Sequence, residues 1–285
     1  MLGIVDVGGG MRGVYSSGIY DCFLKEDVRA DYCLGVSAGS ANLITYVANQ
    51  MGRTRRFYSI YSMRSEYMGG KNFFKKGSFI DLDYVFSVLT NEGGEDPLDY
   101  DAVMNNPICF VCAATRACDG EGVFFTKDDI KRNDYGILKA SCCIPVVNRP
   151  VKVYGQEYYD GGIAEPIPFK KAFEDGCDKV VVVLTKPRED YAVEKRTIAL
   201  GSKILKKYPK ICDEMATLPQ RCKQLLDELS ELEKQGKVYV FEPNDCMGAD
   251  TLTRNRNTIL RLYTKGYNDA LKAINHSDFF SFLNS

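Results

Sequence analysis

Short apolar runs alternate with longer amphipathic stretches along most of the chain. Apolar runs bounded by glycine or proline predict strands at 2–7, 31–36, 108–115, 122–126, 179–185 and 237–241. Apolar residues at helical spacing predict helices at 12–26, 38–48, 133–143, 194–207, 211–235 (broken near Pro219) and 255–274. This alternation favours an α/β fold with a mostly parallel central sheet between helical layers, in a single domain over residues 1–285.

One segment, residues 52–97, departs from the alternation. It mixes cationic with aromatic side chains and contains two glycine pairs, Gly69-Gly70 and Gly93-Gly94. The side chains concerned are Arg53, Arg55, Arg56, Phe57, Tyr58, Tyr61, Arg64, Tyr67, Lys71, Phe73, Phe74, Lys75 and Lys76. We expect an insertion here that serves as a lid or groove, and a mostly helical part over residues 190–285.

Ser37 lies in the sequence Gly35-Val36-Ser37-Ala38-Gly39, between a predicted strand and a predicted helix. This G-x-S-x-G pattern is typical of a nucleophile elbow, in which small flanking residues allow a sharp turn that exposes the serine hydroxyl. The amide of Ala38 and the start of the following helix would then face a developing oxyanion. The alternative is an ordinary turn in which Ser37 only caps the helix.

A glycine-rich loop follows the first predicted strand. Gly8, Gly10 and Gly13 fit the G-x-G-x-x-G fingerprint of dinucleotide-binding proteins. That fold also needs an acidic residue at the end of the second strand, to hold the ribose. Asp27 and Asp31 both precede that strand. A nucleotide-dependent oxidoreductase is therefore the less favoured interpretation, and we expect the loop amides to form an oxyanion hole opposite Ser37.

Asp160 begins an Asp-Gly-Gly turn after a predicted strand. Its carboxylate could act as a base if a partly dry environment raised its pKa, because an ordinary aspartate is too weak a base for a serine hydroxyl. For an isolated turn of this kind, the alternative is an Asx turn without a catalytic part. The single histidine of the chain, His276, lies far from Ser37 in sequence, which disfavours a Ser-His-Asp triad.

Composition narrows the possible partners. Lys and Arg number 37 and Asp and Glu 38, so any affinity for anionic membranes or nucleic acid must be local. The chain has neither a long apolar run nor the charged start of a signal peptide. Its 11 cysteines favour reduced thiols and a cytoplasmic location. Cys109 and Cys112 should point to opposite faces of a strand. We therefore expect no metal and no cofactor.

Three motifs taken together resemble those of the patatin-like phospholipase family. They are D-V-G-G-G-M-R-G at 6–13, G-V-S-A-G-S at 35–40 and D-G-G at 160–162. Residues 140–145 resemble the short helix and proline that this family has before its D-G-G turn. The resemblance covers about residues 2–185. It implies a three-layer α/β/α fold and a Ser–Asp dyad without histidine, acting on acyl esters of phospholipids, lysophospholipids or neutral glycerides.

The resemblance also implies roles for individual residues. Ser37 would be the nucleophile and Asp160 the base. The implied oxyanion hole comprises the amides of Gly9, Gly10, Met11 and Ala38. Gly35 and Gly39 would shape the elbow. Arg12 matches the family's basic residue in the glycine loop, where it would steady the loop or meet a phosphate.

We therefore expect a lipid ester as substrate, a transient contact with a membrane surface, and no nucleic acid as partner. The membrane contact would use the rings and cations of residues 52–97, and Phe73 and Phe74 would help to form the acyl groove. The alternative for this segment is a lid packed over the active site. The alternative for the whole chain is a non-hydrolytic lipid-binding or regulatory protein on the same fold.

Overall fold

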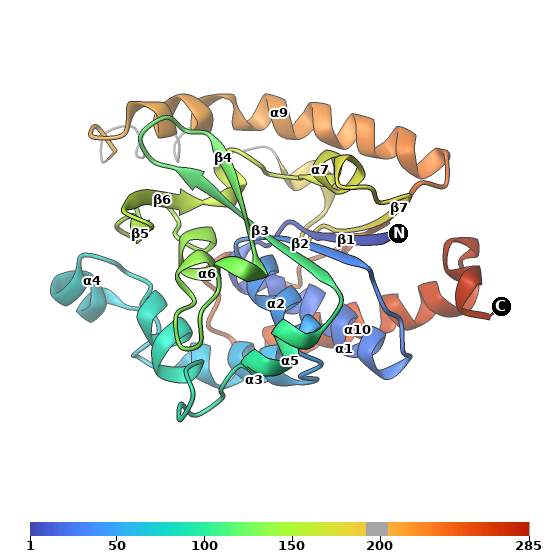
Figure 1. Cartoon of the computed structure of the whole chain (residues 1–285), viewed down its shortest axis with the longest axis horizontal. Coiled ribbons are helices and arrows are strands. Elements are labelled where there is room, and N and C mark those ends of the chain that lie inside the picture. The colour runs from blue at the N-terminus through green and yellow to red at the C-terminus, as the bar shows by residue number, and fades with distance from the viewer. Residues whose placement is uncertain (192–204, 285) are drawn as a thin grey trace.

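The computed structural model describes residues 1–191 and 205–284, which form one central eight-stranded sheet (Figure 1). The strand order is β5-β6-β3-β2-β1-β7-β8, and β4 also pairs with β3. The strands are β1 (Leu2–Asp6), β2 (Tyr32–Val36), β3 (Cys109–Arg116), β4 (Gly122–Thr126), β5 (Val151–Val153), β6 (Gln156–Asp160), β7 (Lys179–Val183) and β8 (Val238–Phe241). The neighbouring strands β3, β2, β1, β7 and β8 pair in parallel. The pairs β3–β4, β3–β6 and β5–β6 are antiparallel. The predicted mostly parallel sheet is confirmed.

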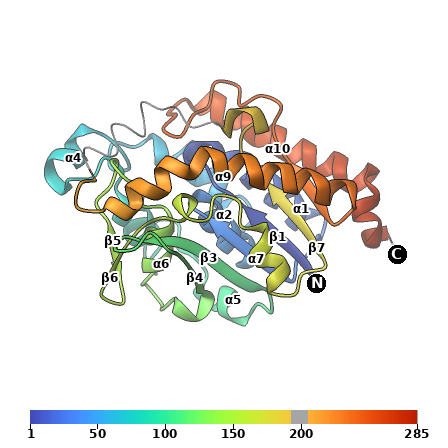
Figure 2. The same cartoon turned by 90° about the horizontal axis from the view of Figure 1, so that it is seen from above.

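Helices cover both faces of this sheet (Figures 1 and 2). One face carries α7 (Phe169–Glu174) and α9 (Pro209–Lys234). The other carries α1 (Val14–Lys25), α2 (Ala38–Val47), α3 (Arg53–Ser59), α5 (Tyr100–Asn105), α6 (Gly136–Ser141) and α10 (Arg256–His276). A further helix, α4 (Gly70–Lys76), extends from one end of the molecule. Segments of 3-10 helix are η1 (Gly10–Gly13), η2 (Tyr61–Met63), η4 (Lys127–Asp129), η5 (Gly161–Ile163), η6 (Arg188–Tyr191) and η7 (Asp278–Asn284), and η3 (Tyr84–Leu89) is a π-helix.

The core has two layers because successive strand residues point to opposite faces. In β7, Val181 and Val183 pack into the cluster around α1 and α2, while Val180 and Val182 pack into the cluster beneath α7 and α9. This arrangement explains the uninterrupted β-branched run, which is typical of a strand covered on both faces. In β3, Cys112 is buried and Cys109 is exposed.

The C-terminal part is joined to the same layers. β8 extends the sheet in parallel next to β7. Helix α10 packs along α1, and two tyrosine hydroxyls bind carboxylates across this contact: Tyr15 to Asp269 at 2.7 Å and Tyr263 to Asp21 at 2.8 Å. Among the described helices, none has the length and apolar character needed to cross a membrane.

Two helix predictions differ from the structure. The expected break near Pro219 is wrong, because α9 runs without interruption from Pro209 to Lys234. A proline removes only one helical hydrogen bond and tends to bend a helix, and here buried side chains on both sides of Pro219, including Ile211 and Cys222, hold α9 against the protein. Most of the helix predicted at 194–207, residues 194–204, lies outside the described residues. The remaining residues, 205–207, are not helical.

Candidate active site

The turn between β2 and α2 is sharp and strained at Ser37. Its φ is 54° and its ψ is −131°, a region that residues with a side chain rarely occupy. The Ser37 carbonyl accepts hydrogen bonds from the amide of Ser40 at 3.0 Å and from the Ser40 hydroxyl at 2.6 Å. The Ser37 amide donates to Oγ of Ser141 at 2.9 Å. These bonds hold the serine in a conformation typical of a nucleophile elbow.

The two glycines of the elbow lie where the sequence analysis places them. Gly35 belongs to β2 and pairs with Asp6 of β1 and Cys112 of β3. Gly39 lies in the first turn of α2, and a Cβ there would be 2.4 Å from the carbonyl oxygen of Asp6 and 2.6 Å from its Cγ. Only glycine lets α2 begin this close to the end of β1.

The glycine loop lies directly against the elbow. Residues 8–10 all have positive φ. A Cβ on Gly8 would be 2.3 Å from the carbonyl oxygen of Val36 and 2.9 Å from Cβ of Ser37. The amide of Gly8 donates to Oδ1 of Asp6 at 2.9 Å, and its carbonyl accepts a bond from Oγ1 of Thr185. The loop is therefore fixed beside the serine before any ligand binds.

One predicted oxyanion donor is engaged elsewhere. The amide of Met11 donates to the carbonyl of Thr251 at 3.1 Å, so this part of the expected hole needs correction. An amide bonded in this way positions the loop rather than a substrate. The amides of Gly9, Gly10 and Ala38 remain as the candidate donors, and the positive end of the α2 dipole lies beside them.

Arg12 also reaches Thr251. Its Nη2 donates to Oγ1 of Thr251 at 3.2 Å. Within the described residues its Nε is buried and has no hydrogen-bond partner. The pKa of the nearby Lys186 is lowered mainly by burial and secondly by the positive charge of Arg12. The contact with Thr251 supports the loop-steadying role among the two that the sequence analysis allows.

Asp160 ends β6 and lies beside Ser37. Its carboxylate accepts a hydrogen bond from the amide of Gly162 at 2.9 Å, and the nearby Ser37 side chain acts to lower its pKa. Its backbone is fixed on both sides, because its amide donates to Cys143 and its carbonyl accepts from Thr115, each at 2.8 Å. Burial raises the pKa of Asp160 to about 6, although the nearby Ser37 side chain and the hydrogen bond from Gly162 oppose this rise. The carboxylate is therefore a stronger base than an ordinary aspartate and is still ionised near neutral pH.

A second buried carboxyl, Asp6, lies under the glycine loop and is absent from the sequence analysis as a site residue. Burial raises the pKa of Asp6 to about 6. Its carboxylate accepts bonds from the amide of Gly8 and the hydroxyl of Tyr20, the latter at 3.1 Å. The nearby polar side chains of Ser16 and Asn42 also lower the pKa of Asp6. The sequence signal that could have identified Asp6 as a site residue is its position two residues before Gly8, the first glycine of the loop.

Ser37 opens into an apolar cavity of about 80 Å³. The cavity follows α2 past Ala41 and Ile44, a path of about 10 Å along two helical turns. Residues 52–97 supply much of its lining, including Phe57, Tyr58, Tyr61, Tyr67, Ile80, Leu82, Val85, Phe86 and Leu89. The predicted groove-forming role of this segment thus has a structural basis, but Phe73 and Phe74 do not belong to the lining.

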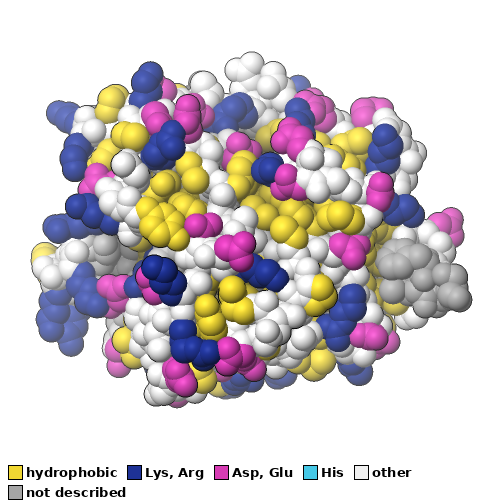
Figure 3. Space-filling model, in the orientation of Figure 1, with side chains coloured by type: hydrophobic (Ala, Val, Ile, Leu, Met, Phe, Trp, Pro, Cys, Tyr) yellow, Lys and Arg dark blue, Asp and Glu magenta, His cyan; other side chains and the backbone are white. Residues whose placement is uncertain are grey.

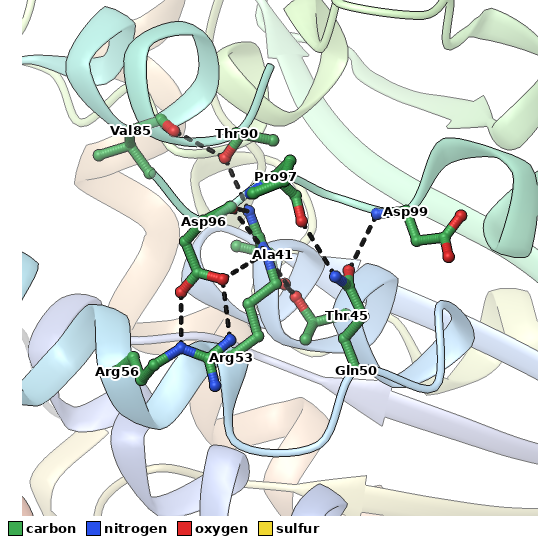
Figure 4. Close-up of polar contacts among 10 residues, drawn as sticks. All are labelled: Ala41, Thr45, Gln50, Arg53, Arg56, Val85, Thr90, Asp96, Pro97 and Asp99. Carbon is green, nitrogen blue, oxygen red and sulfur yellow. Dashed lines mark hydrogen bonds and ion pairs between the residues drawn. The ribbon is translucent and has the colours of Figure 1, made fainter. Parts of the chain in front are cut away.

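Arg53, Arg56 and Asp96 form a polar network at this cavity (Figure 4). Arg53 donates to Oγ1 of Thr45 at 3.2 Å, to Oγ1 of Thr90 at 2.9 Å and to the carbonyl of Asp96 at 2.9 Å. Arg56 binds both carboxylate oxygens of Asp96, at 2.9 and 2.8 Å. Such a two-pronged bond is geometrically specific. The network ties the end of the 52–97 segment to α2 and α3.

The remaining sequence candidates lie elsewhere. His276 is exposed at the last residue of α10 and does not line the cavity of Ser37. Asp31 precedes β2, and its Oδ2 accepts the amide of Leu2 at 2.7 Å. It thus lies at the opposite end of the strands from the glycine loop, where it could not hold a ribose. In the described part of the chain, no three His, Cys, Asp or Glu side chains are grouped to hold a metal ion.

These features define a class of α/β proteins with a strained serine elbow next to a glycine loop. The model of the patatin-like phospholipase family matches residues 7–173, more than half of the chain. The chain belongs to this family. Residues 208–282 match a second model, described as a domain of unknown function, DUF6363. Thr251, β8 and α10 all fall within this second match.

Two known proteins are similar to this chain, one in sequence and one in fold. The "Uncharacterized protein YjjU" of Escherichia coli K12 is 31% identical over 195 residues, which cover 67% of this chain and 53% of that protein. This chain therefore spans about half the length of that curated relative. The crystal structure of VipD from Legionella pneumophila has the same fold, with a TM-score of 0.52 at 13% identity. That match covers 96% of this chain and 66% of VipD.

Proposed function

We propose that the protein is a lipid acyl hydrolase that uses Ser37 and Asp160 as a catalytic dyad. The observation that carries the proposal is the strained backbone of Ser37 beside Asp160, a buried carboxylate whose pKa is raised to about 6 by burial and lowered in part by Ser37. Membership of the patatin-like phospholipase family supports the same chemistry. The apolar cavity beside Ser37 supports an acyl chain as the group that is bound.

The reaction has two steps. Asp160 takes the proton of the Ser37 hydroxyl while Oγ attacks the ester carbonyl carbon, and the amides of Gly9, Gly10 and Ala38 stabilise the oxyanion. The C–O bond to the alcohol breaks, the alcohol leaves with the proton, and an acyl-enzyme remains. Water then loses a proton to Asp160 and attacks the acyl carbon, which releases the carboxylic acid and restores Ser37.

The test is hydrolysis of p-nitrophenyl esters of graded chain length by the wild type, Ser37→Ala and Asp160→Asn. We expect activity in the wild type, a loss of at least about 10³-fold in Ser37→Ala, and intact folding in both variants. Ser65→Ala is a matched control because Ser65 is exposed in another segment. A fluorophosphonate probe should label the wild type at Ser37 and leave Ser37→Ala unlabelled.

The natural ester would follow from panels of phospholipids, lysophospholipids and glycerides. An inactive wild type that still bound lipid would contradict the proposal and favour a non-hydrolytic lipid-binding protein on this fold. Full activity in Asp160→Asn would contradict the dyad and require another base.

A further inference from the structure

Helix α4 carries two phenylalanine side chains that the fold does not bury. Phe74 is 90% exposed and Phe73 is 51% exposed, and their rings contact each other edge to face at 6.3 Å between centroids. Large apolar side chains exposed next to one another mark a contact surface more often than a fold requirement. Figure 1 shows α4 extending beyond the body of the molecule, and the exposure of the two rings leaves them able to meet a flat partner.

Four cations lie on α4 or next to its end. Lys71, Lys75 and Lys76 share the short helix with them, and all three are exposed. Arg149 adds a fourth cation, since its guanidinium lies against Gly77 at the end of α4. Lys76 is paired with Asp81. In Figure 3, Lys and Arg atoms gather at the edge of the molecule where α4 lies.

The base of this projection is part of the cavity wall. Met68 and Ile80 form an antiparallel bridge below α4, and the amide of Asp81 donates to the carbonyl of Tyr67 at 2.7 Å. Tyr67 and Ile80 both line the cavity that holds Ser37. A surface that received the tip of α4 would therefore lie close to the cavity.

We propose that α4 is a membrane-docking element that inserts Phe73 and Phe74 into an anionic phospholipid bilayer while its lysines contact the headgroups. Rings that enter the interface and cations that meet anionic headgroups are the combination that binds such a surface. The chain has a net charge of −1, so this attraction is local. The docking proposal does not depend on the proposed catalysis. The further step, delivery of a membrane lipid to Ser37, rests on the proposed function.

The absence of tryptophan from the sequence makes a direct test possible. In the full-length chain, Phe74→Trp introduces a single tryptophan in α4 whose emission can be excited apart from that of the tyrosines, and Met51→Trp provides a control at an exposed apolar residue outside α4. With vesicles of phosphatidylcholine and phosphatidylglycerol, the emission of the Phe74→Trp variant should shift to shorter wavelength and be quenched by brominated lipid. The emission of the Met51→Trp variant should not change.

Co-sedimentation with the same vesicles measures the contribution of each group. Phe73→Ser/Phe74→Ser and Lys71→Glu/Lys75→Glu should each weaken binding at least about tenfold, and Met51→Ser should not. High salt or pure phosphatidylcholine should weaken wild-type binding. All variants should retain the circular dichroism of the wild type and its rate on water-soluble esters, which separates a docking defect from a failed active site.

Two results would overturn the proposal. One is equal vesicle binding by the wild type and both double variants. The other is a concentration-dependent dimer of the wild type that Phe73→Ser/Phe74→Ser abolishes, without any vesicle binding, because α4 would then contact a second copy of the chain. Both results are independent of whether Ser37 proves to be catalytic.

Discussion

Asp6 at the end of β1 and Asp160 at the end of β6 are both buried, and burial raises the pKa of each to about 6. They differ in what faces them. Asp6 is enclosed by donors that belong to the fold, among them the amide of Gly8 and the hydroxyl of Tyr20. Asp160 accepts one bond from its own turn and otherwise faces the side chain of Ser37, which acts to lower its pKa. The same perturbed pKa therefore accompanies two roles, and only the partners distinguish a structural carboxylate from a candidate base.

The largest expected difference is in activity. Asp160→Asn should lower kcat/KM by about 10²- to 10⁴-fold, because an amide cannot accept the Ser37 proton. Asp6→Asn should lower it by about tenfold or less, because Asp6 only positions the glycine loop. Ester hydrolysis by the two variants, side by side and with matched circular dichroism, checks the comparison. Similar losses in both would contradict the separation of roles.

Asp160→Asn should gain stability at neutral pH although it loses activity. Because the folded pKa of Asp160 exceeds its ordinary value of 3.8, the folded chain binds more protons between pH 4 and 6, and stability falls as the pH rises through this window. Asp160→Asn should therefore raise the free energy of unfolding at pH 7.5 by on the order of 2 kcal/mol, with little gain below about pH 4.

Asp6→Asn is the control for this stability change. It should show no such gain, because its new amide hydrogens would face the donors that surround Asp6. Urea unfolding of both variants at pH 7.5 and at pH 3.5 measures the difference. A gain in Asp6→Asn equal to that in Asp160→Asn would show that burial alone decides the effect.

The pH dependence of the rate is the next test. Only the ionised carboxylate can take a proton, so kcat/KM should rise with pH around 6 and be about tenfold below its plateau at pH 5. Asp6→Asn should keep this profile, because Asp6 takes no proton in the reaction. A profile that is flat between pH 5 and 8, or one that Asp6→Asn shifts, would argue against Asp160 as the titrating base.

The smallest expected effect concerns the loop contact from the C-terminal part. Thr251→Val removes the oxygen that accepts from Arg12 but keeps the carbonyl that accepts from Met11. The donor is charged, but the bond is long at 3.2 Å and only partly buried, so we expect it to contribute about 1 kcal/mol and kcat/KM to fall about fivefold. Thr264→Val, at an exposed position of α10, is the control. A loss above about a hundredfold would mean that the Arg12 contact is essential to the loop.

Much of the fold could be predicted because its signals are local. The β-branched run of β7 and the alternation of strands and helices were predicted from hydrophobic periodicity. The elbow was predicted from the small residues around Ser37. The bounds of β5 and β6 were not predicted, since both strands are short and β6 joins the sheet by pairing antiparallel with β3, far away in sequence. The helix break expected at Pro219 failed because packing on both sides of a proline outweighs one lost hydrogen bond.

By itself, the sequence determined the fold class, the family motifs and the candidates Ser37 and Asp160, because strand-to-helix turns and glycine loops are written in contiguous residues. Only the tertiary structure decided that Met11 donates to Thr251, that Asp6 is buried under the loop, and that Phe73 and Phe74 lie outside the cavity. Each of these depends on which segments meet in space. Burial, and with it the pKa of a carboxyl or the exposure of a ring, is a property of neighbours that no local pattern contains.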